Sequence, residues 1–313
     1  MCVLLGAQKS GTSFLANCVA RHPLCHDHCN GVPRQGSSRC RQCMDAGDTG
    51  DATERWCVSC AKEAALHELK RRRIAWELPA PTVQNVQGFG FSGHPRYLLG
   101  GFDMAERFAA TGVPHRFLVV LRDPVSRAWS QYSAVKRKAA AARNGNGCRA
   151  KPWPATNWDQ CTFASLVAEE VQALRVAGVD ASSTPVDWHN LCVACEQNFV
   201  ARYQTEGHGD FGLVARGLYV LQLLPWLRVF GMERVRVLFL TDLIERPEAE
   251  MHGLWEFLRV ETPPFDPMAD VSKPRHVGQL AEPLPAEVAQ LLRSFYAPFD
   301  SALWHLLGLA PRW

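Results

Sequence analysis

The chain has 313 residues, of which 47% are apolar, and this is enough to bury a large core in one α/β domain. Its 34 basic and 31 acidic residues leave a net charge of +3, which excludes the strong basic excess of a dedicated nucleic-acid binder. The longest apolar stretches, residues 117–121 and 217–227, are shorter than the ~20 residues that span a bilayer, so we expect no transmembrane segment.

The first residues combine an apolar run, a small polar turn and an amphipathic stretch, which read CVLLGAQKSGTSFLANCVARHP. This pattern predicts a buried strand at residues 2–5 and a helix at residues 12–21. Because the strand follows Met1 at once, no secretory signal precedes it, and we expect the natural N-terminus to lie further upstream.

Residues from 24 to about 60 are rich in Gly, Asp, Ser, Arg and Cys and show little periodicity, which predicts a loop-rich insertion. Eight of the 12 cysteines lie within the first sixty residues. The spacings Cys40-x2-Cys43 and Cys57-x2-Cys60 match those of a zinc ribbon. Disulfides in a secretory compartment would use the same cysteines, so structural zinc and disulfides both stay open.

Strands alternate with helices along the rest of the chain. The apolar segments at residues 117–121 and 235–240 predict strands, and the segment RDPVSRAWSQYSAVKRK after the first of them predicts a turn and a helix. Residues 79–93 read as a connection with Pro and Gly, and about 139–160 as a polar insertion. Other helices are expected at residues 61–74, 102–110, 163–177, 217–230 and 249–259. This alternation predicts one α/β domain over residues 1–313, a P-loop-like three-layer fold with a central parallel sheet flanked by helices.

The opening turn, GAQKSGTS, contains the parts of a phosphate-binding turn: glycines, hydroxyls and a lysine between a strand and a helix. A nucleotide kinase is one interpretation, but its loop reads G-x-x-x-x-G-K-[ST], whereas here Lys9 precedes Gly11. The only candidate for a magnesium-binding acid after a strand is Asp242. The kinase interpretation therefore remains the alternative rather than the first choice.

Lys-Ser-Gly-Thr-Ser after an N-terminal strand resembles the 5′-phosphosulfate loop of sulfotransferases that use 3′-phosphoadenosine 5′-phosphosulfate. The segment LRDPVSRAWSQY resembles the 3′-phosphate motif of this family, in which an Arg ends a strand and a Ser follows eight residues later. An Arg fork and a Ser hydroxyl both suit a phosphate. The resemblance implies that the cofactor is bound by Lys9, Ser10, Gly11, Thr12, Ser13, Arg122 and Ser130.

Residues 216–260 are similar to the membrane-bound, carbohydrate-modifying branch of this family, the heparan sulfate type, and the segment SKPRHV looks like its late basic loop. The resemblance implies that Lys273 and Arg275 also contact the cofactor, although Pro274 stands where the family usually has Gly. It further implies sulfuryl transfer to a hydroxyl or amine of a carbohydrate or other small acceptor, without a catalytic metal, in the Golgi lumen.

The catalytic base of this branch is commonly a Glu in a KExxFF-like segment. The segment AKEAALHEL offers Glu63 at a comparable place, without the aromatic pair, and His67 lies four residues further on as the alternative base. Lys9 would neutralise the charge that develops on the leaving phosphate. The segment GFSGHPRYLL is similar to the K-S-P-x-Y-L segment of the family, which implies that Arg96 contacts the acceptor. A binding protein that has lost the base is a further alternative.

Overall fold

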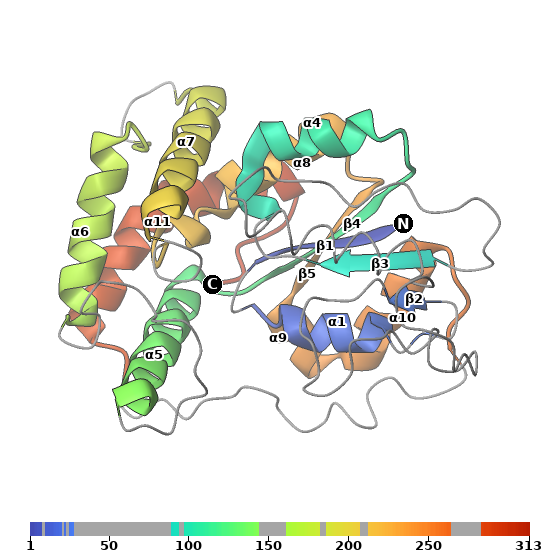
Figure 1. The fold of residues 1–313 in the computed structure, drawn as a ribbon, viewed down its shortest axis with the longest axis horizontal. Helices are drawn as coiled ribbons and strands as arrows, with labels where there is room; N and C mark the ends of the chain where they lie inside the picture. The colour runs from blue at the N-terminus through green and yellow to red at the C-terminus, as the bar shows by residue number, and fades with distance from the viewer. Residues whose placement is uncertain are drawn as a thin grey trace, which may run out of the picture.

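The computed structural model describes residues 1–7, 10–20, 22, 25–27, 89–93, 97–143, 161–181, 186–206, 212–263 and 283–313. Its strands form one parallel sheet in the order β2-β3-β1-β4-β5 (Figure 1). They are β1 (Cys2–Gly6), β2 (Cys25–Asp27), β3 (Phe89–Gly93), β4 (Arg116–Leu121) and β5 (Val235–Phe239). The prediction of an α/β fold around a parallel sheet is therefore confirmed.

Helices cover both faces of the sheet (Figure 1). One face carries α1 (Thr12–Ala20), α9 (Leu240–Glu245) and α10 (Pro247–Leu258), and the other carries α4 (Gly101–Ala110) and α8 (Tyr219–Phe230). Successive strand residues point to opposite faces. In β1, Val3 and Leu5 accordingly pack into the core with α4 and α8, while Cys2 and Leu4 pack into the core with α1 and α10.

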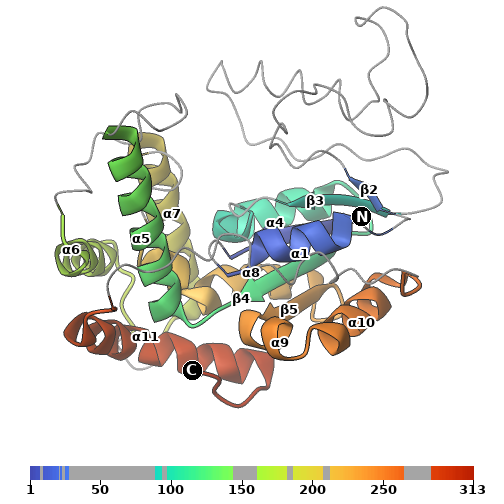
Figure 2. The same cartoon turned by 90° about the horizontal axis from the view of Figure 1, so that it is seen from below.

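The remaining helices extend the domain beyond the carboxyl ends of the strands (Figures 1 and 2). They are α5 (Pro124–Arg143), α6 (Phe163–Val176), α7 (Trp188–Glu206) and α11 (Ala286–Leu307), with short 3-10 turns η1 (Leu98–Gly100) and η2 (Ala215–Gly217). Helix α11 contacts α5, α6 and α8, so it holds this part of the domain together. None of the helices in the described ranges is long and apolar enough to cross a membrane.

Several segments differ from the sequence-based prediction, among them helices α7 and α11, which were not predicted. Residues 25–27 and 89–93, expected in a loop-rich insertion and a connection, form β2 and β3. The first is only 3 residues long, and the second contains Gly90, Ser92 and Gly93 among its five residues, so neither has the apolar signature of a buried strand. Helix α5 continues to Arg143, so residues 139–143, expected at the start of a polar insertion, are helical, because their alanines favour helix.

The strand order places two turns side by side. The chain leaves β1 toward β2 on one side of the sheet and leaves β4 toward β5 on the other side. In open parallel sheets, ligands bind at the carboxyl edge where the connections diverge in this way. Gly6 is paired with Val119, and the Ala7 N–H donates to the Val120 carbonyl at 2.9 Å, so the turn after β1 lies against the end of β4.

Candidate functional site

The turn after β1 converts the strand into α1 within a few residues. Ser10 is buried, and its N–H donates to the Ala7 carbonyl at 3.3 Å. Gly11 has a φ of +86°, and a Cβ at this position would lie 2.6 Å from Leu240 Cδ1. The conformation is one that glycine adopts without strain. The Leu15 N–H then donates to the Gly11 carbonyl at 3.1 Å, which starts the helix.

The N-terminal end of α1 is free of acidic side chains in its first turn. Thr12 is half-buried and Ser13 is exposed there. The Ser10 hydroxyl is buried and lies beside the Tyr219 hydroxyl. The N–H groups of the first turn of a helix, a buried hydroxyl and the positive end of the helix dipole together suit an anion.

The turn after β4 presents a cation. Arg122 is half-buried, and no carboxylate in the described ranges forms an ion pair with it. The neighbouring Asp123 instead caps α5, because its side chain accepts from the N–H groups of Val125 at 3.3 Å and Ser126 at 3.1 Å. Burial lowers the pKa of Arg122, and the nearby Arg127 adds to this effect, while Tyr219 and Asp123 oppose it. Arg122 is thus a partly desolvated guanidinium that an anion would stabilise.

Tyr219, the first residue of α8, connects the two turns. Its hydroxyl donates to the Arg122 carbonyl at 2.8 Å. The Ser10 side chain interacts with the same hydroxyl and slightly opposes the rise of its pKa. Burial raises the pKa of Tyr219 to about 12, so the phenol stays protonated and remains a donor at neutral pH. Ser130 lies further along α5 and is half-buried. The structure therefore brings Ser10 and Arg122 to the same edge of the sheet.

A buried turn at residues 212–217 precedes Tyr219 and is held by side chains. Arg127 donates to the carbonyls of Gly212, at 3.3 Å, and Leu213, while Glu170 accepts from the N–H groups of Val214 and Ala215, both at 3.0 Å. Tyr296 donates to the Val214 carbonyl at 2.8 Å, and Gln222 to the Ala215 carbonyl at 3.0 Å. Buried backbone groups need such partners, so these four side chains fix the turn that positions Tyr219.

Gly217 joins this turn to the start of α5. A Cβ at this position would lie 2.6 Å from the Tyr296 hydroxyl and 2.9 Å from Pro124 Cβ. The close approach leaves room for glycine alone. The turn before α8 therefore packs directly against the residue that follows Asp123.

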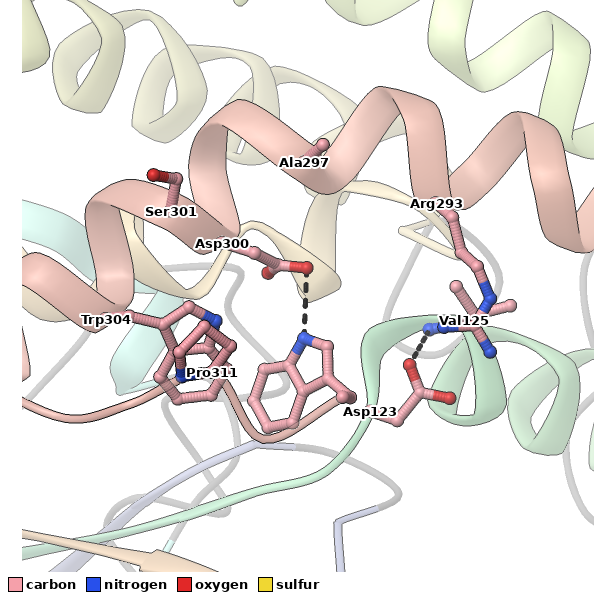
Figure 3. Close-up of a pocket in the computed structure, with 9 residues that line it drawn as sticks. Asp123, Val125, Arg293, Ala297, Asp300, Ser301, Trp304 and Pro311 are labelled. Atoms are coloured by element: carbon pink, nitrogen blue, oxygen red, sulfur yellow. Dashed lines mark hydrogen bonds between the residues drawn. The ribbon is translucent and has the colours of Figure 1, made fainter.

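A cavity of about 360 Å³ adjoins the Arg122 turn on its α11 side (Figure 3). Its lining residues are Asp123, Val125, Arg293, Ala297, Asp300, Ser301, Trp304, Pro311 and Trp313. The Trp313 indole N–H donates to Asp300 at 3.0 Å (Figure 3). Burial raises the pKa of Asp300 to about 7, with Asp123 adding to the rise and Trp313 and Arg293 opposing it.

Asp300 should make the stability of the fold depend on pH. Its folded pKa of about 7 exceeds the usual 3.8, so the folded state holds an extra proton between these values. This stability contribution is complete below about pH 4 and is lost as the pH rises through about 7. We expect Asp300→Asn, which keeps an acceptor for Trp313, to raise the thermal unfolding midpoint by a few degrees more at pH 8 than at pH 5. Glu287→Gln, on the exposed start of α11, is the control. Equal shifts of the unfolding midpoint by Asp300→Asn at pH 5 and pH 8 would contradict a raised pKa of Asp300.

Several predicted site residues lie outside the described residues. They are the cofactor and catalytic candidates Lys9, Glu63, His67, Lys273 and Arg275, the acceptor contact Arg96, and the cysteines Cys40, Cys43, Cys57 and Cys60. Within the described ranges, no group of three or more His, Cys, Asp or Glu side chains could hold a metal ion. Nothing else supports zinc, and we do not propose it.

Sequence reasoning missed the residues that support the site rather than form it. Arg127 and Glu170 are fully or almost fully buried charged side chains, yet in the sequence they look like ordinary surface residues of helices. Tyr219 follows Gly217 in the pattern Gly-x-Tyr, within the segment 216–260 whose sequence is similar to the carbohydrate-modifying branch of the family. A tyrosine opening a helix after a glycine turn does not by itself indicate which backbone carbonyl it binds.

Comparison with known proteins gives a consistent class. No protein-family model matches the chain. A solved structure of a sulfotransferase from Alicyclobacillus acidocaldarius superimposes with a TM-score of 0.53 at 19% identity, covering 99% of this chain and 96% of that one. The fold is therefore that of a sulfotransferase structure.

Curated relatives point to the same class. The chain is 28% identical to the membrane-associated sulfotransferase kil1 of Dictyostelium discoideum, over 39% of this chain and 25% of that protein. It is 25% identical to carbohydrate sulfotransferase 15 of Rattus norvegicus, over 75% of this chain and 38% of that protein. The chain thus spans about a quarter to two fifths of the length of these relatives. The resemblance to sulfotransferases, including a carbohydrate sulfotransferase, is confirmed.

Proposed function

We propose that this chain is a sulfotransferase that transfers a sulfuryl group from 3′-phosphoadenosine 5′-phosphosulfate to a hydroxyl or amine of a carbohydrate. The observation that carries the proposal is that two turns, each suited to bind an anion, lie side by side at the carboxyl edge of the sheet. One turn holds the buried Ser10 hydroxyl at the start of α1, and the other holds Arg122 without an ion-pair partner in the described chain. A nucleotide with phosphate groups at two ends would satisfy both turns.

The residues of the two turns fit such a nucleotide. The N–H groups and hydroxyls at residues 10–13, with Lys9, would hold the 5′-phosphosulfate at the positive end of α1. Arg122 and Ser130 would hold the 3′-phosphate, with the guanidinium donating two parallel hydrogen bonds. Lys273 and Arg275 would add charge from the late basic loop. Tyr219 keeps the Arg122 turn in place.

The chemistry needs a leaving-group stabiliser and a base. When bound, 3′-phosphoadenosine 5′-phosphosulfate supplies the sulfuryl group: the bond from sulfur to the acceptor oxygen or nitrogen forms as the bond to the 5′-phosphate oxygen breaks. Lys9 and the N–H groups of the opening turn would stabilise the charge that collects on that phosphate. Glu63, or alternatively His67, would take the acceptor proton.

The proposed acceptor rests on the name of a relative, and the proposed compartment rests on the sequence resemblance to the membrane-bound branch of the family. One relative is named a carbohydrate sulfotransferase and another a membrane-associated sulfotransferase. We therefore propose a carbohydrate acceptor, with Arg96 as a contact, and a location in the Golgi lumen. In that oxidising compartment the cysteines between residues 28 and 60 would form disulfides. Mass spectrometry of the unreduced protein, with and without thiol alkylation, tests this.

The function is tested by following sulfur-35 from labelled 3′-phosphoadenosine 5′-phosphosulfate into a panel of glycans in the presence of EDTA. We expect incorporation that EDTA does not reduce and that Glu63→Gln or His67→Asn abolishes, whichever is the base. Full incorporation in both variants would refute both candidate bases. Binding of the nucleotide without transfer to any glycan would make the chain a non-catalytic relative, and phosphorylation from ATP with magnesium would make it a kinase.

A further inference from the structure

Four arginines that form no ion pair in the described chain lie at the N-terminal ends of the strands, opposite the two turns. They are Arg116, Arg234, Arg236 and Arg259, which we call the arginine edge. These residues are found at the N-terminal ends of β4 and β5 and at the C-terminal end of α10, on the side of the sheet where the N-terminus lies (Figure 1). Within the described ranges, no carboxylate forms an ion pair with any of the four.

Arg116 and Arg234 face each other across the β4–β5 ladder. Phe117 pairs with Val235, and the Phe117 N–H donates to the Arg234 carbonyl at 2.7 Å, so the two arginines are cross-strand neighbours. Two guanidinium groups at neighbouring positions of adjacent chain segments repel each other. Burial lowers the pKa of Arg116, and the charges of Arg259 and Arg234 lower it further. The charge of Arg234 also acts on His115. Burial is the main cause that lowers the pKa of His115 to about 4, and the Met1 amine and Arg234 lower it further.

Arg236 and Arg259 also occupy positions that do not favour arginine. Arg236 is half-buried over Gly253 of α10, where a Cβ would lie 2.6 Å from its Nη2 atom, and its buried Nε has no hydrogen-bond partner in the described chain. Arg259 ends α10 with a φ of 59° in the left-handed region, the only such non-glycine residue in the described ranges. Glycine or asparagine usually fills that position. Residues that break local preferences are expected at functional sites.

None of the carboxylates near the arginine edge in the described ranges forms an ion pair with its arginines. Glu256 pairs with His252 at 3.4 Å, and the Glu233 carboxylate folds back over Gly231. The C-terminal end of α10 contributes a negative partial charge of about half an elementary charge, which offsets only a small part of four guanidinium groups. Arg116 in addition lies over the Phe257 ring, with its Cζ 5.3 Å from the ring centroid, which fixes its direction. The arginine edge thus carries a concentrated positive charge.

We propose that the arginine edge is a binding site for a sulfated polysaccharide chain, separate from the site where transfer takes place. Guanidinium groups match sulfate and carboxylate groups through two parallel hydrogen bonds. The identity of the polymer rests on the proposed function, because sulfuryl transfer to carbohydrate turns the acceptor into a sulfated polyanion. The site would hold a sulfated stretch of the same chain whose next sugar enters the transfer site.

The position of the edge favours a polymer over a small acceptor. Strands of five or six residues separate it from the two turns, which is a distance of about 17–20 Å at ~3.3 Å per residue. A monosaccharide bound at one end of the sheet cannot reach the other, whereas an extended chain can. The low net charge of +3 disfavours a general nucleic-acid surface.

The test measures binding of fluorescent heparin to the whole chain, without nucleotide, at several salt concentrations. The variants are Arg259→Gly and the double variant Arg116→Gln/Arg234→Gln, and the controls with equal charge loss are Arg175→Gln and Arg107→Gln/Arg175→Gln. We expect the double variant to bind heparin about tenfold more weakly than its control, with a smaller salt dependence. Arg259→Gly should weaken binding while it maintains or raises the thermal unfolding midpoint, because glycine relaxes the left-handed position.

Two results would overturn the proposal. The first is unchanged heparin affinity in both folded edge variants relative to their controls. The second is an arginine-dependent affinity for double-stranded DNA, or for phosphatidylserine vesicles, that exceeds the affinity for heparin. The double variant should also bind 3′-phosphoadenosine 5′-phosphate as the parent does, and this readout separates failure of the edge from failure of the proposed sulfotransferase site.

Discussion

Arg122→Ala should weaken binding of 3′-phosphoadenosine 5′-phosphate by about 10- to 100-fold, because the variant loses charge-assisted hydrogen bonds to the 3′-phosphate. Adenosine 5′-phosphate, which lacks that group, should lose less than about threefold, since Arg122 would not contact the rest of the nucleotide. Isothermal titration calorimetry with both nucleotides measures the difference. The affinity of Arg122→Lys for 3′-phosphoadenosine 5′-phosphate should lie between those of the parent and Arg122→Ala, because lysine keeps the charge and loses the planar fork.

The fold should tolerate the change at Arg122. No ion pair of the described chain involves its side chain, and Tyr219 binds its backbone carbonyl, which alanine retains. Arg175→Ala, an exposed arginine in the last turn of α6, is the matched control and should leave both affinities unchanged. Equal losses for the two nucleotides in Arg122→Ala would place the 3′-phosphate elsewhere.

Glu170→Ala should lower the free energy of unfolding by about 3–5 kcal/mol, because it leaves the Val214 and Ala215 N–H groups buried without acceptors. This is a large part of the ~5–15 kcal/mol that typically stabilises a domain. Urea denaturation, followed by tryptophan fluorescence, gives the value. Glu170→Gln keeps one acceptor oxygen and should cause a smaller loss.

The neighbouring Glu169 provides the control for Glu170. It is exposed on the same helix, so Glu169→Ala should change the free energy of unfolding by less than about 0.5 kcal/mol. Because the turn at residues 212–217 positions Tyr219, folded Glu170→Gln should also bind 3′-phosphoadenosine 5′-phosphate more weakly than the parent. Equal stability of Glu170→Ala and Glu169→Ala would show that the buried turn does not depend on this carboxylate.

Strongly patterned elements could be predicted from the sequence. The apolar run of β4 and the amphipathic pattern of α4 identified these elements to within one residue. Strand β3, with the sequence FGFSG, was missed because it lacks β-branched residues and takes its stability from neighbours on both sides. Helix α7 was missed because its polar sequence shows weak periodicity, although Leu191, Cys192 and Cys195 are buried.

The candidate site could likewise be predicted only in part. The turns with Gly11 and Arg122 could be found because local sequence determines a strand, a turn and a helix. The structure places these turns side by side, whereas their roles in binding remain predictions. The support from Arg127 and Glu170 depends on partners 85 and 44 residues away in the chain, and no local pattern encodes such pairs. Burial of these charges becomes visible only in the folded structure.

The most direct measurement is calorimetric titration of the whole chain with 3′-phosphoadenosine 5′-phosphate, adenosine 5′-phosphate, and ATP with magnesium. We expect that 3′-phosphoadenosine 5′-phosphate binds most tightly, that the 3′-phosphate contributes at least about tenfold in affinity, and that magnesium has no effect. Preference for ATP with magnesium, or equal affinity with and without the 3′-phosphate, would contradict the claim that the two turns hold one nucleotide.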